Sequence, residues 1–384
     1  MIGRGVASVV LALLLAGVPG VGVAHAEPEQ CDPPKGTMEA AESWAQRRFD
    51  VKNTVWRFTR GEGVTVAVVD SGIDLTHPQI RVAGKGDFTR TGHRDCVGHG
   101  TAVAGIIAAL HYKDVLFHGV APGVKLLSLK QTNSERGDVR LLARAIRAAA
   151  ELDADVINVS AKANDHPDLR AAVEFALSKD VVIVAAAGNK TAEDGTPVRA
   201  YPASYEGVLS VGSATSDGRV ADSSNPITPV SVLAPGQNLS STWTGRAYQD
   251  GLEGTSYAAP YVTGVVALVR SRFPRLNQQQ VRQRVIATAE GAVGKGSGAG
   301  MVNPLQAVTA ILPFEAANAP VIAPPLPEPL PAGVVSRVPP VDRHAIDVAL
   351  IVGAAALAAA GLAVAAKMLV PMGRRRGWRP GGAD

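Results

Sequence analysis

Three short sequence blocks contain the residue types that a serine nucleophile needs. A run of valines ends at Asp70, His99 stands between two glycines, and Ser256 lies in the block Gly-Thr-Ser-Tyr-Ala-Ala-Pro. A serine hydroxyl is a weak nucleophile that requires a base to take its proton and a carboxylate to orient that base. We therefore predict that Asp70, His99 and Ser256 form a catalytic triad.

The elements expected around the three blocks fit this chemistry. Residues 64–69 are an apolar, β-branched run that predicts a buried parallel strand, so Asp70 would lie at the carboxyl end of the strand, where α/β sheets hold their active sites. His99 begins a small-residue helix expected over 99–110, and Ser256 lies in the first turn of an apolar helix expected over 254–272.

An oxyanion hole is also predicted. Backbone N–H groups at the start of a helix can stabilise developing negative charge near Ser256. Asn189 follows the apolar run 181–187 and Gly188, and its side-chain amide is the predicted second donor.

Each block has a simpler interpretation when it is taken alone. Asp70-Ser-Gly matches the aspartic-protease signature, but those enzymes need two carboxylates, and no second Asp-Ser/Thr-Gly occurs in the chain. His99 could be a packed residue in a tight turn, and Gly-Thr-Ser256 could be an ordinary helix cap. The three blocks in this chain order, with Asn189 between the second and the third, favour the catalytic interpretation.

The remaining pattern predicts an α/β fold. Further strands are expected at 124–130, 156–160, 181–187 and 208–212, and further helices at 138–152, 169–179 and 277–288. Strand and helix alternate over about 250 residues, which predicts one doubly wound parallel sheet with helices on both faces.

The two ends of the 384-residue chain predict export and a membrane anchor. Residues 1–26 combine an apolar stretch with the small-x-small site Ala24-His-Ala26, which is typical of a secretory signal peptide. Residues 348–366 are an unbroken apolar run followed by four arginines, so we expect a transmembrane helix over 346–370 and a basic cytoplasmic tail over 371–384. A buried helix of the globular domain is the alternative for the apolar run.

The charge of the chain is concentrated in that tail. Residues 367–384 contain five Lys or Arg and one Asp, so their net charge equals the +4 of the whole chain. The basic balance therefore indicates anionic lipid headgroups rather than nucleic acid as its partner. The preceding segment, 313–345, is rich in proline and predicts a semi-rigid linker, with a docking strip for a partner as the alternative.

Cys31 and Cys96 are the two cysteines of the chain. An even number of cysteines in an exported protein favours a disulfide, and two free thiols are the alternative. The bond would join the N-terminal extension, residues 27–60, to the loop that precedes His99.

The three blocks and Asn189 resemble the subtilase family over residues 61–312. With the signal peptide, the Cys31-bearing extension, the linker, the single membrane helix and the basic tail, the layout resembles the mycosins, which are membrane-anchored subtilases of actinobacterial type VII secretion systems. This resemblance implies a subtilisin-like fold and an extracytoplasmic serine endopeptidase in the cell membrane. Exported polypeptides and membrane components of the secretion system would be its partners. The alternative is a mainly structural subunit of that secretion complex with dispensable proteolysis.

The resemblance also allows the groove to be compared with that of other subtilases. Where many subtilases carry a Gly pair beside the substrate, this chain has Ala161-Lys162-Ala163, which predicts a narrowed or reshaped groove and restricted processing. The primary pocket is expected to be apolar, with no charge that reads Lys or Arg. The predicted substrate-binding residues are Ser160, Ala161, Ala185, Ala187 and Ala200.

No cofactor or metal site is expected. The loop at 110–115 occupies the place where many subtilases hold calcium, and Lys113 puts a cation where an oxygen ligand would be needed. The short extension 27–60 leaves no room for a separate folded prodomain, so we expect it to wrap over the catalytic domain.

Overall fold

The computed structural model describes residues 31–134, 137–190, 197–291, 294–315 and 343–377. The chain divides into two units, 1–320 and 321–384, which are described separately. The predicted signal peptide, 1–26, and most of the predicted linker, 313–345, lie outside the described residues.

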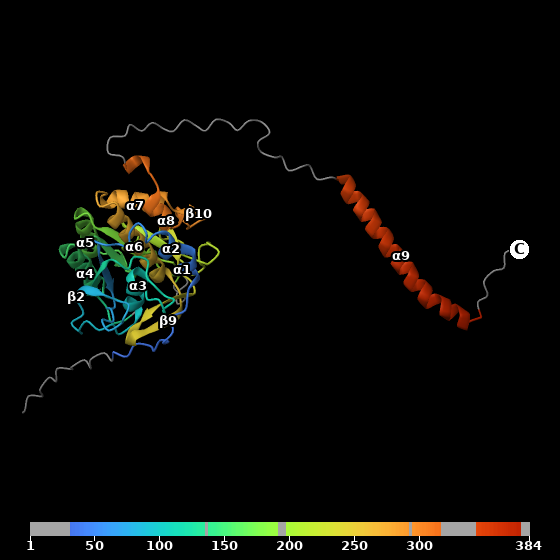
Figure 1. Ribbon diagram of the computed structural model, residues 1–384, viewed down its shortest axis with the longest axis horizontal. Helices are drawn as coiled ribbons and strands as arrows, with labels where there is room; N and C mark the ends of the chain where they lie inside the picture. The colour runs from blue at the N-terminus through green and yellow to red at the C-terminus, as the bar shows by residue number, and fades with distance from the viewer. Residues whose placement is uncertain (1–30, 135–136, 191–196, 292–293, 316–342, 378–384) are drawn as a thin grey trace, which may run out of the picture. The chain divides into compact units, whose positions relative to one another are not determined.

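A mostly parallel sheet forms the centre of the first unit (Figure 1). In the described residues it has nine strands in the order β10-β11-β7-β6-β5-β4-β1-β3-β2, and only the β10–β11 pair is antiparallel. Its strands are β1 Thr65–Asp70, β2 Val82–Asp87, β3 Lys125–Lys130, β4 Val156–Val159, β5 Val182–Ala186, β6 Leu209–Ala214, β7 Val232–Pro235, β10 Glu290–Gly291 and β11 Gly300–Met301. A separate antiparallel hairpin pairs β8, Leu239–Trp243, with β9, Ala247–Leu252.

Both faces of the sheet are buried, which explains the apolar strand sequences. In β1, Val66 and Val68 belong to one core cluster, whereas Ala67 and Val69 belong to the cluster on the opposite face. Because side chains alternate along a strand, a strand covered on both sides has to be apolar at every position.

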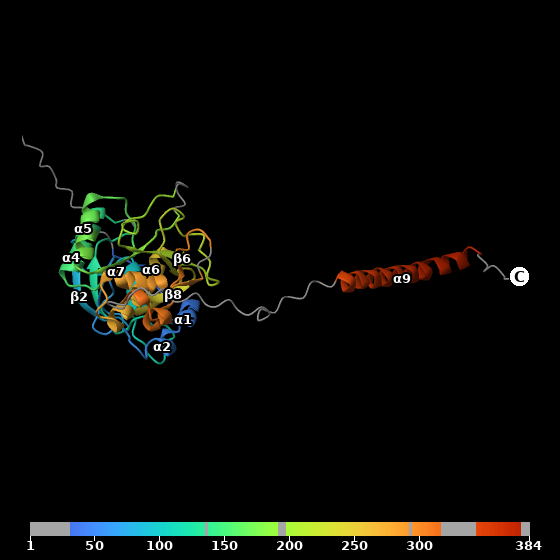
Figure 2. The ribbon, with the colours of Figure 1, turned by 90° about the horizontal axis from the view of Figure 1, so that it is seen from above.

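Helices cover the two faces of the sheet unequally. The helices α4, Val139–Glu151, and α5, Pro167–Ser178, pack together on one face and lie side by side in both views (Figures 1 and 2). The other face carries six helices of the described chain. They are α1 Trp44–Phe49, α2 Val51–Thr54, α3 His99–Ala108, α6 Thr255–Arg272, α7 Gln278–Ala287 and α8 Pro304–Thr309.

The doubly wound architecture predicted from the sequence is confirmed, and every strand and helix predicted for the first unit is present to within two residues at each end. The capping box at the start of α7 is present as well, because Asn277 and Gln280 exchange side-chain to backbone hydrogen bonds. The sequence did not predict β2, β7, the short β10–β11 pair or the β8–β9 hairpin. Strand β2 contains two glycines and a lysine at an edge of the sheet, so it lacks the apolar signal of a buried strand.

The described part of the N-terminal extension crosses the β8–β9 hairpin. Thr37 exchanges two backbone hydrogen bonds of 2.8 Å with Tyr248, and the indole N–H of Trp243 donates to the Pro34 carbonyl at 2.6 Å. The Trp44 indole N–H donates to the Gln237 carbonyl at 2.9 Å. Segments far apart in the sequence therefore hold the extension on the catalytic unit.

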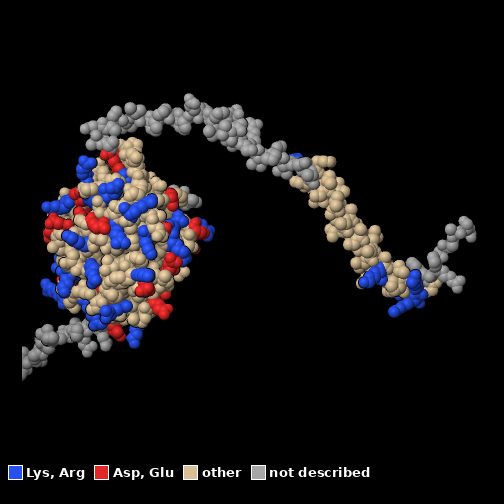
Figure 3. All heavy atoms as spheres, viewed as in Figure 1, with Lys and Arg blue, Asp and Glu red and all other residues tan. Residues whose placement is uncertain are grey.

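The described residues of the second unit, 343–377, form the long helix α9, Arg343–Arg375. Its portion Ile346–Arg375 reaches a mean hydropathy of 2.4 and is long and apolar enough to cross a membrane. Figure 3 shows an uncharged length of helix with Lys and Arg gathered near its C-terminal end, whereas on the visible face of the first unit both signs of charge are interspersed. The helix therefore fits a single-pass membrane anchor.

A buried ion pair fastens the last described segment of the first unit. The Arg284 side chain is 1% exposed, and its guanidinium donates to both carboxylate oxygens of Glu315 and to the carbonyls of Ala307 and Ala310. The same group lies 4.1 Å from the centre of the Phe273 ring.

Replacing Arg284 with alanine should lower the stability of the catalytic unit by about 3–5 kcal/mol, because it leaves the half-buried Glu315 carboxylate and two carbonyls without their donor. Denaturant unfolding of the full chain measures the loss. The matched control is Arg219→Ala, whose pair with Asp217 is exposed to solvent and should contribute little to stability. Equal losses of unfolding free energy in the two variants would show that the buried pair stabilises the protein no more than the exposed pair does.

Candidate active site

Asp70 and His99 are in direct contact at the carboxyl edge of the sheet. Asp70 is the last residue of β1 and is 4% exposed, and His99 is the first residue of α3. The Nδ1 atom of His99 lies 2.7 Å from Oδ1 of Asp70. Strand β1 pairs with β4 on one side and β3 on the other, so Asp70 sits where the strand order changes direction, which is the usual ligand-binding crevice of such sheets.

Two glycines permit the close approach of α3 to β1. A Cβ atom on Gly100 would lie 2.0 Å from the Gly72 carbonyl oxygen and 3.2 Å from the side chain of Asp70. Gly98 caps α3 with a φ of +88°, and a Cβ there would collide with the Trp243 ring at 2.4 Å. The Gly-His99-Gly block is therefore required by packing as well as by chemistry.

Ser256 lies in the first turn of α6, as the sequence predicts for its block. Its carbonyl oxygen accepts a hydrogen bond of 2.7 Å from the hydroxyl of Ser160. The next residue, Tyr257, packs against His99 with the ring centres 5.1 Å apart. The start of α6 is thus brought to the same place as the Asp70–His99 pair.

Ser160 belongs to a network that sequence reasoning did not identify. Its hydroxyl accepts from Asn158 Nδ2 at 2.9 Å, and Asn158 Oδ1 accepts from Thr263 Oγ1 at 2.7 Å. These buried side chains connect the end of β4 to the middle of α6 and position the first turn of that helix. The available signal in the sequence was a polar residue within each of two apolar segments, Asn158 in β4 and Thr263 in α6.

Asn189 also contacts the start of α6. Its Oδ1 accepts from the backbone N–H of Thr255 at 2.9 Å and from the Thr255 hydroxyl at 3.0 Å. Because both Thr255 groups are donors, the Asn189 atom that they contact is the amide oxygen, and this fixes the orientation of the side-chain amide. Its Nδ2 atom lies 2.7 Å from the position that a Cβ on Gly254 would occupy. The donor end of Asn189 therefore faces the Gly254–Ser256 turn.

The residues predicted to contact substrate are placed differently from one another. Ala161 is half-buried at the surface, whereas Ser160 binds α6. Ala185 has no exposed surface and packs in the core cluster under α4 and α5, so its place in the substrate pocket remains a prediction. Ala187 and Ala200 are also buried, at 0% and 1% exposure.

Lys162 lies beside this buried alanine cluster. A Cβ on Gly188 would approach Lys162 Cδ to 3.6 Å and the Ala200 methyl group to 2.9 Å. The aliphatic stem of Lys162 therefore passes over Gly188, next to Asn189, while the residue as a whole is exposed. A cation thus stands near the place where the sequence predicts an uncharged pocket.

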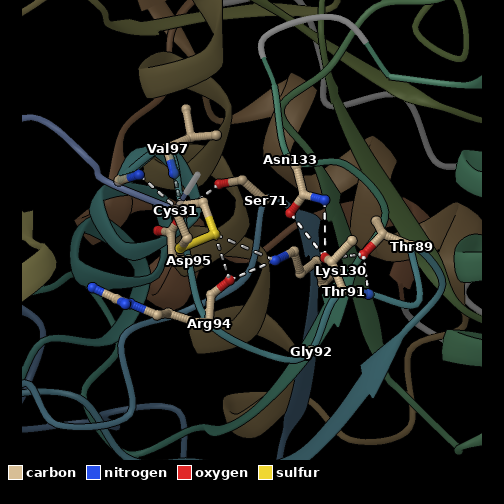
Figure 4. The surroundings of a disulfide bond; sticks show 12 residues. Cys31, Ser71, Thr89, Thr91, Gly92, Arg94, Asp95, Val97, Lys130 and Asn133 are labelled. Atoms are coloured by element: carbon tan, nitrogen blue, oxygen red, sulfur yellow. Dashed lines mark hydrogen bonds between the residues drawn. A yellow bond between two sulfur atoms is a disulfide. The ribbon is translucent and has the colours of Figure 1, made fainter. Parts of the chain in front are cut away.

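A disulfide of 2.06 Å joins Cys31 to Cys96, three residues before His99 (Figure 4). The ammonium of the fully buried Lys130, at the end of β3, donates to the Arg94 carbonyl at 2.6 Å and lies 3.9 Å from Cys96 Sγ. The loop before His99 is therefore held from both sides.

His77, in the loop after β1, has a structural role. Its Nε2 lies 3.1 Å from the Ala247 carbonyl, and its ring packs on Tyr248. Burial lowers the pKa of its imidazole and outweighs the opposing effect of the hydrogen bond to Ala247. Among the described residues, no group of three or more His, Cys, Asp and Glu is placed to hold a metal ion.

Comparisons with known proteins show what this chain is similar to. The model of the Subtilase family matches residues 61–306. Mycosin-3 and Mycosin-4 of Mycobacterium tuberculosis are 38% and 37% identical to this chain; the alignments cover 71% and 83% of it and 74% and 80% of those proteins. A crystal structure of MycP1 from the ESX-1 type VII secretion system superimposes with a TM-score of 0.69 at 32% identity, covering 77% of this chain and 94% of the other.

From the position of Lys162 we predict which charge the enzyme prefers on the substrate side chain. An acidic substrate side chain near Gly188 should be favoured over a basic one, and Lys162→Glu should reverse that order. Because an exposed ion pair contributes about 0.2–1 kcal/mol and the substitution replaces attraction by repulsion for each peptide, the ratio of kcat/KM for matched Asp and Lys peptides should change roughly 10-fold. Lys125→Glu is the control, because Lys125 is exposed at the amino end of β3, away from the strand ends that carry Asp70. An unchanged ratio in Lys162→Glu would place the substrate side chain elsewhere.

Proposed function

The chain belongs to the subtilase family of serine endopeptidases, and from this premise we propose that it is a mycosin-type protease acting on exported polypeptides. Asp70, His99 and Ser256 are the proposed catalytic triad. The observation that carries the proposal is the 2.7 Å contact between Asp70 and His99 beside the first turn of α6.

The contact assigns a role to each nitrogen of His99. A carboxylate accepts hydrogen bonds, so Nδ1 carries the proton that is donated to Asp70, and Nε2 is left as the basic nitrogen. In the proposed reaction Nε2 takes the hydroxyl proton of Ser256 as its oxygen attacks the peptide carbonyl, and later gives the proton to the leaving amine. The buried Asp70 stabilises the imidazolium formed between the two steps.

Asn189 is proposed to stabilise the tetrahedral intermediate. Its Oδ1 is occupied by Thr255, which turns Nδ2 toward the Gly254–Ser256 turn. The backbone N–H groups at the start of α6 supply further donors and a favourable dipole. Both donors are held in place before substrate binds, so little reorganisation is needed as charge develops.

The proposed location is the outer side of the cell membrane. Helix α9 would be the single anchor, with the arginines at its C-terminal end on the cytoplasmic side because positive residues favour that side. The disulfide supports an oxidising, extracytoplasmic compartment for the first unit. The proposed substrates are polypeptides exported by a type VII secretion system, since the solved relatives MycP1 and MycP3 come from such systems.

The triad assignment predicts covalent labelling. The purified full chain should react with a serine-directed fluorophosphonate at Ser256, and Ser256→Ala should abolish the labelling, because the hydroxyl is the nucleophile. Ser178→Ala, at the exposed end of α5, should label like the unchanged protein. Peptide mapping by mass spectrometry identifies the modified residue. Equal labelling of Ser256→Ala would refute the triad.

A second prediction separates catalysis from assembly. In the host cell, deletion of the gene should abolish type VII export, whereas Ser256→Ala should preserve export and leave the substrates unprocessed. The reason is that a docking face on a secretion complex does not require the catalytic hydroxyl. Immunoblots of secreted proteins, with the variant present at normal level, measure both effects. Loss of export in Ser256→Ala as complete as in the deletion would mean that proteolysis alone explains the requirement.

A further inference from the structure

Asp95 is a buried carboxylate in the loop between β2 and α3, and it is 1% exposed. Its Oδ1 accepts from Ser71 Oγ at 2.9 Å and from the backbone N–H groups of Val97 and Gly98 at 3.0 and 2.9 Å. Its Oδ2 accepts from the backbone N–H and the hydroxyl of Thr101, at 2.9 and 2.6 Å. Figure 4 shows Asp95 and Ser71 beside the disulfide.

The donors that surround Asp95 lie on both sides of His99. The N–H of Gly98 comes immediately before the histidine, and that of Thr101 comes two residues after it. A carboxylate at this position satisfies the unpaired N–H groups at the start of α3 and interacts favourably with the helix dipole. Asp95 therefore determines where the first turn of α3 begins, and with it the position of the imidazole.

Ser71 connects Asp95 to Asp70. Its hydroxyl has one proton and two carboxylates within reach: Asp95 Oδ1 at 2.9 Å and Asp70 Oδ1 at 3.3 Å. The hydroxyl oxygen of Ser71 also accepts a hydrogen bond from the Gly100 N–H at 3.0 Å. Because one proton makes one strong hydrogen bond, the shorter contact to Asp95 takes it.

The direction of the Ser71 hydroxyl proton matters for His99 because Asp70 accepts hydrogen bonds through only one of its carboxylate oxygens in the described structure. Asp70 Oδ1 accepts from the Ser71 backbone N–H at 2.8 Å and from His99 Nδ1 at 2.7 Å, whereas Asp70 Oδ2 is buried without a hydrogen-bond donor among the described residues. A third donor at Oδ1 would compete directly with the imidazole.

We propose that Asp95 is a positioning residue for the triad: it holds the Ser71 hydroxyl proton away from Asp70 and fixes the first turn of α3, so that Asp70 Oδ1 remains available to His99. The inference rests on the proposed function and adds a residue that none of the three catalytic blocks contains. Asp95 does not touch the substrate and acts through Ser71 and the helix start.

Asp95→Asn tests the proposal in the purified full chain. Asparagine replaces one carboxylate oxygen by an N–H₂ group, which cannot accept the hydrogen bonds that Asp95 accepts. The Ser71 hydroxyl should then donate to Asp70, and Asp70 should stabilise the His99 imidazolium less well. We expect kcat per titrated active site to fall about 10- to 100-fold, with KM within about 2-fold of the unchanged protein. The midpoint of the acid limb of kcat/KM should move to lower pH, because the imidazolium of His99 is less stabilised.

The groups around His99 that take part in the comparison come from three elements and one neighbouring loop. Asp70 of β1 and Tyr257 of α6 contact the imidazole, and the hairpin strand β8 contributes the uncharged Trp243 against Gly98. Lys130 of β3 is bound to the neighbouring loop at the Arg94 carbonyl.

Two further variants separate positioning from simple stability. Adding Ser71→Ala to Asp95→Asn removes the competing proton, so the double variant should recover part of the lost kcat and return the acid limb toward its original midpoint. The matched control is Asp138→Asn, because Asp138 caps α4 in the same way through the Arg140 N–H. This control makes the same change at a helix start far from His99 and should leave kcat and the acid limb unchanged.

If Asp95→Asn does not fold, Thr101→Val and Thr101→Ser provide the test, since the serine keeps the hydroxyl that bonds Asp95 and the valine does not. The valine variant should lose kcat several-fold and the serine variant should retain it. A wild-type kcat and acid limb in Asp95→Asn, or equal kcat in the two Thr101 variants, would overturn the inference. Failure of the unchanged protein to label at Ser256 would instead overturn the proposed function, so the two failures are distinguishable.

Discussion

The close contact between the end of β1 and the start of α3 is the constraint around which the catalytic unit is arranged. The 2.7 Å approach of His99 to Asp70 requires a helix whose second residue has no side chain, because a Cβ on Gly100 would lie 2.0 Å from the Gly72 carbonyl. The parallel sheet supplies the fixed strand end, and α6 completes the site from the same face of the sheet. A larger residue at Gly100 would separate the two elements and with them the acid and the base.

Most of the site could be predicted from the sequence because its signals are local. A β-branched run ending in Asp70, and a Gly-His99-Gly block opening a helix of small residues, each indicate an element and a position on it. The positions of Ser160 and Ala185 could not be predicted in this way. Which of two alternating residues faces a helix and which faces the opposite core depends on how the sheet is covered, and a single strand sequence does not contain that information.

The contributions of distant segments were also missing from the sequence pattern. Trp243 lies in a hairpin that the sequence did not predict, yet its ring packs on Gly98 and its N–H binds Pro34. No sequence pattern singles out Asp95, because its importance depends on donors that converge only after folding. Residues of this kind have no spacing rule, since each contact joins positions brought together by tertiary structure.

The Cys31–Cys96 bond changes what proteolytic maturation could mean for this chain. In many secreted proteases, cutting an N-terminal segment releases it, and dissociation makes activation irreversible. Here a cut between Cys31 and Trp44 would leave both pieces joined by the disulfide, with Pro34 and Thr37 still bound to the hairpin. Mature and nicked molecules would have almost the same mass until they are reduced. Processing at this place would alter the connectivity of the molecule and not its composition.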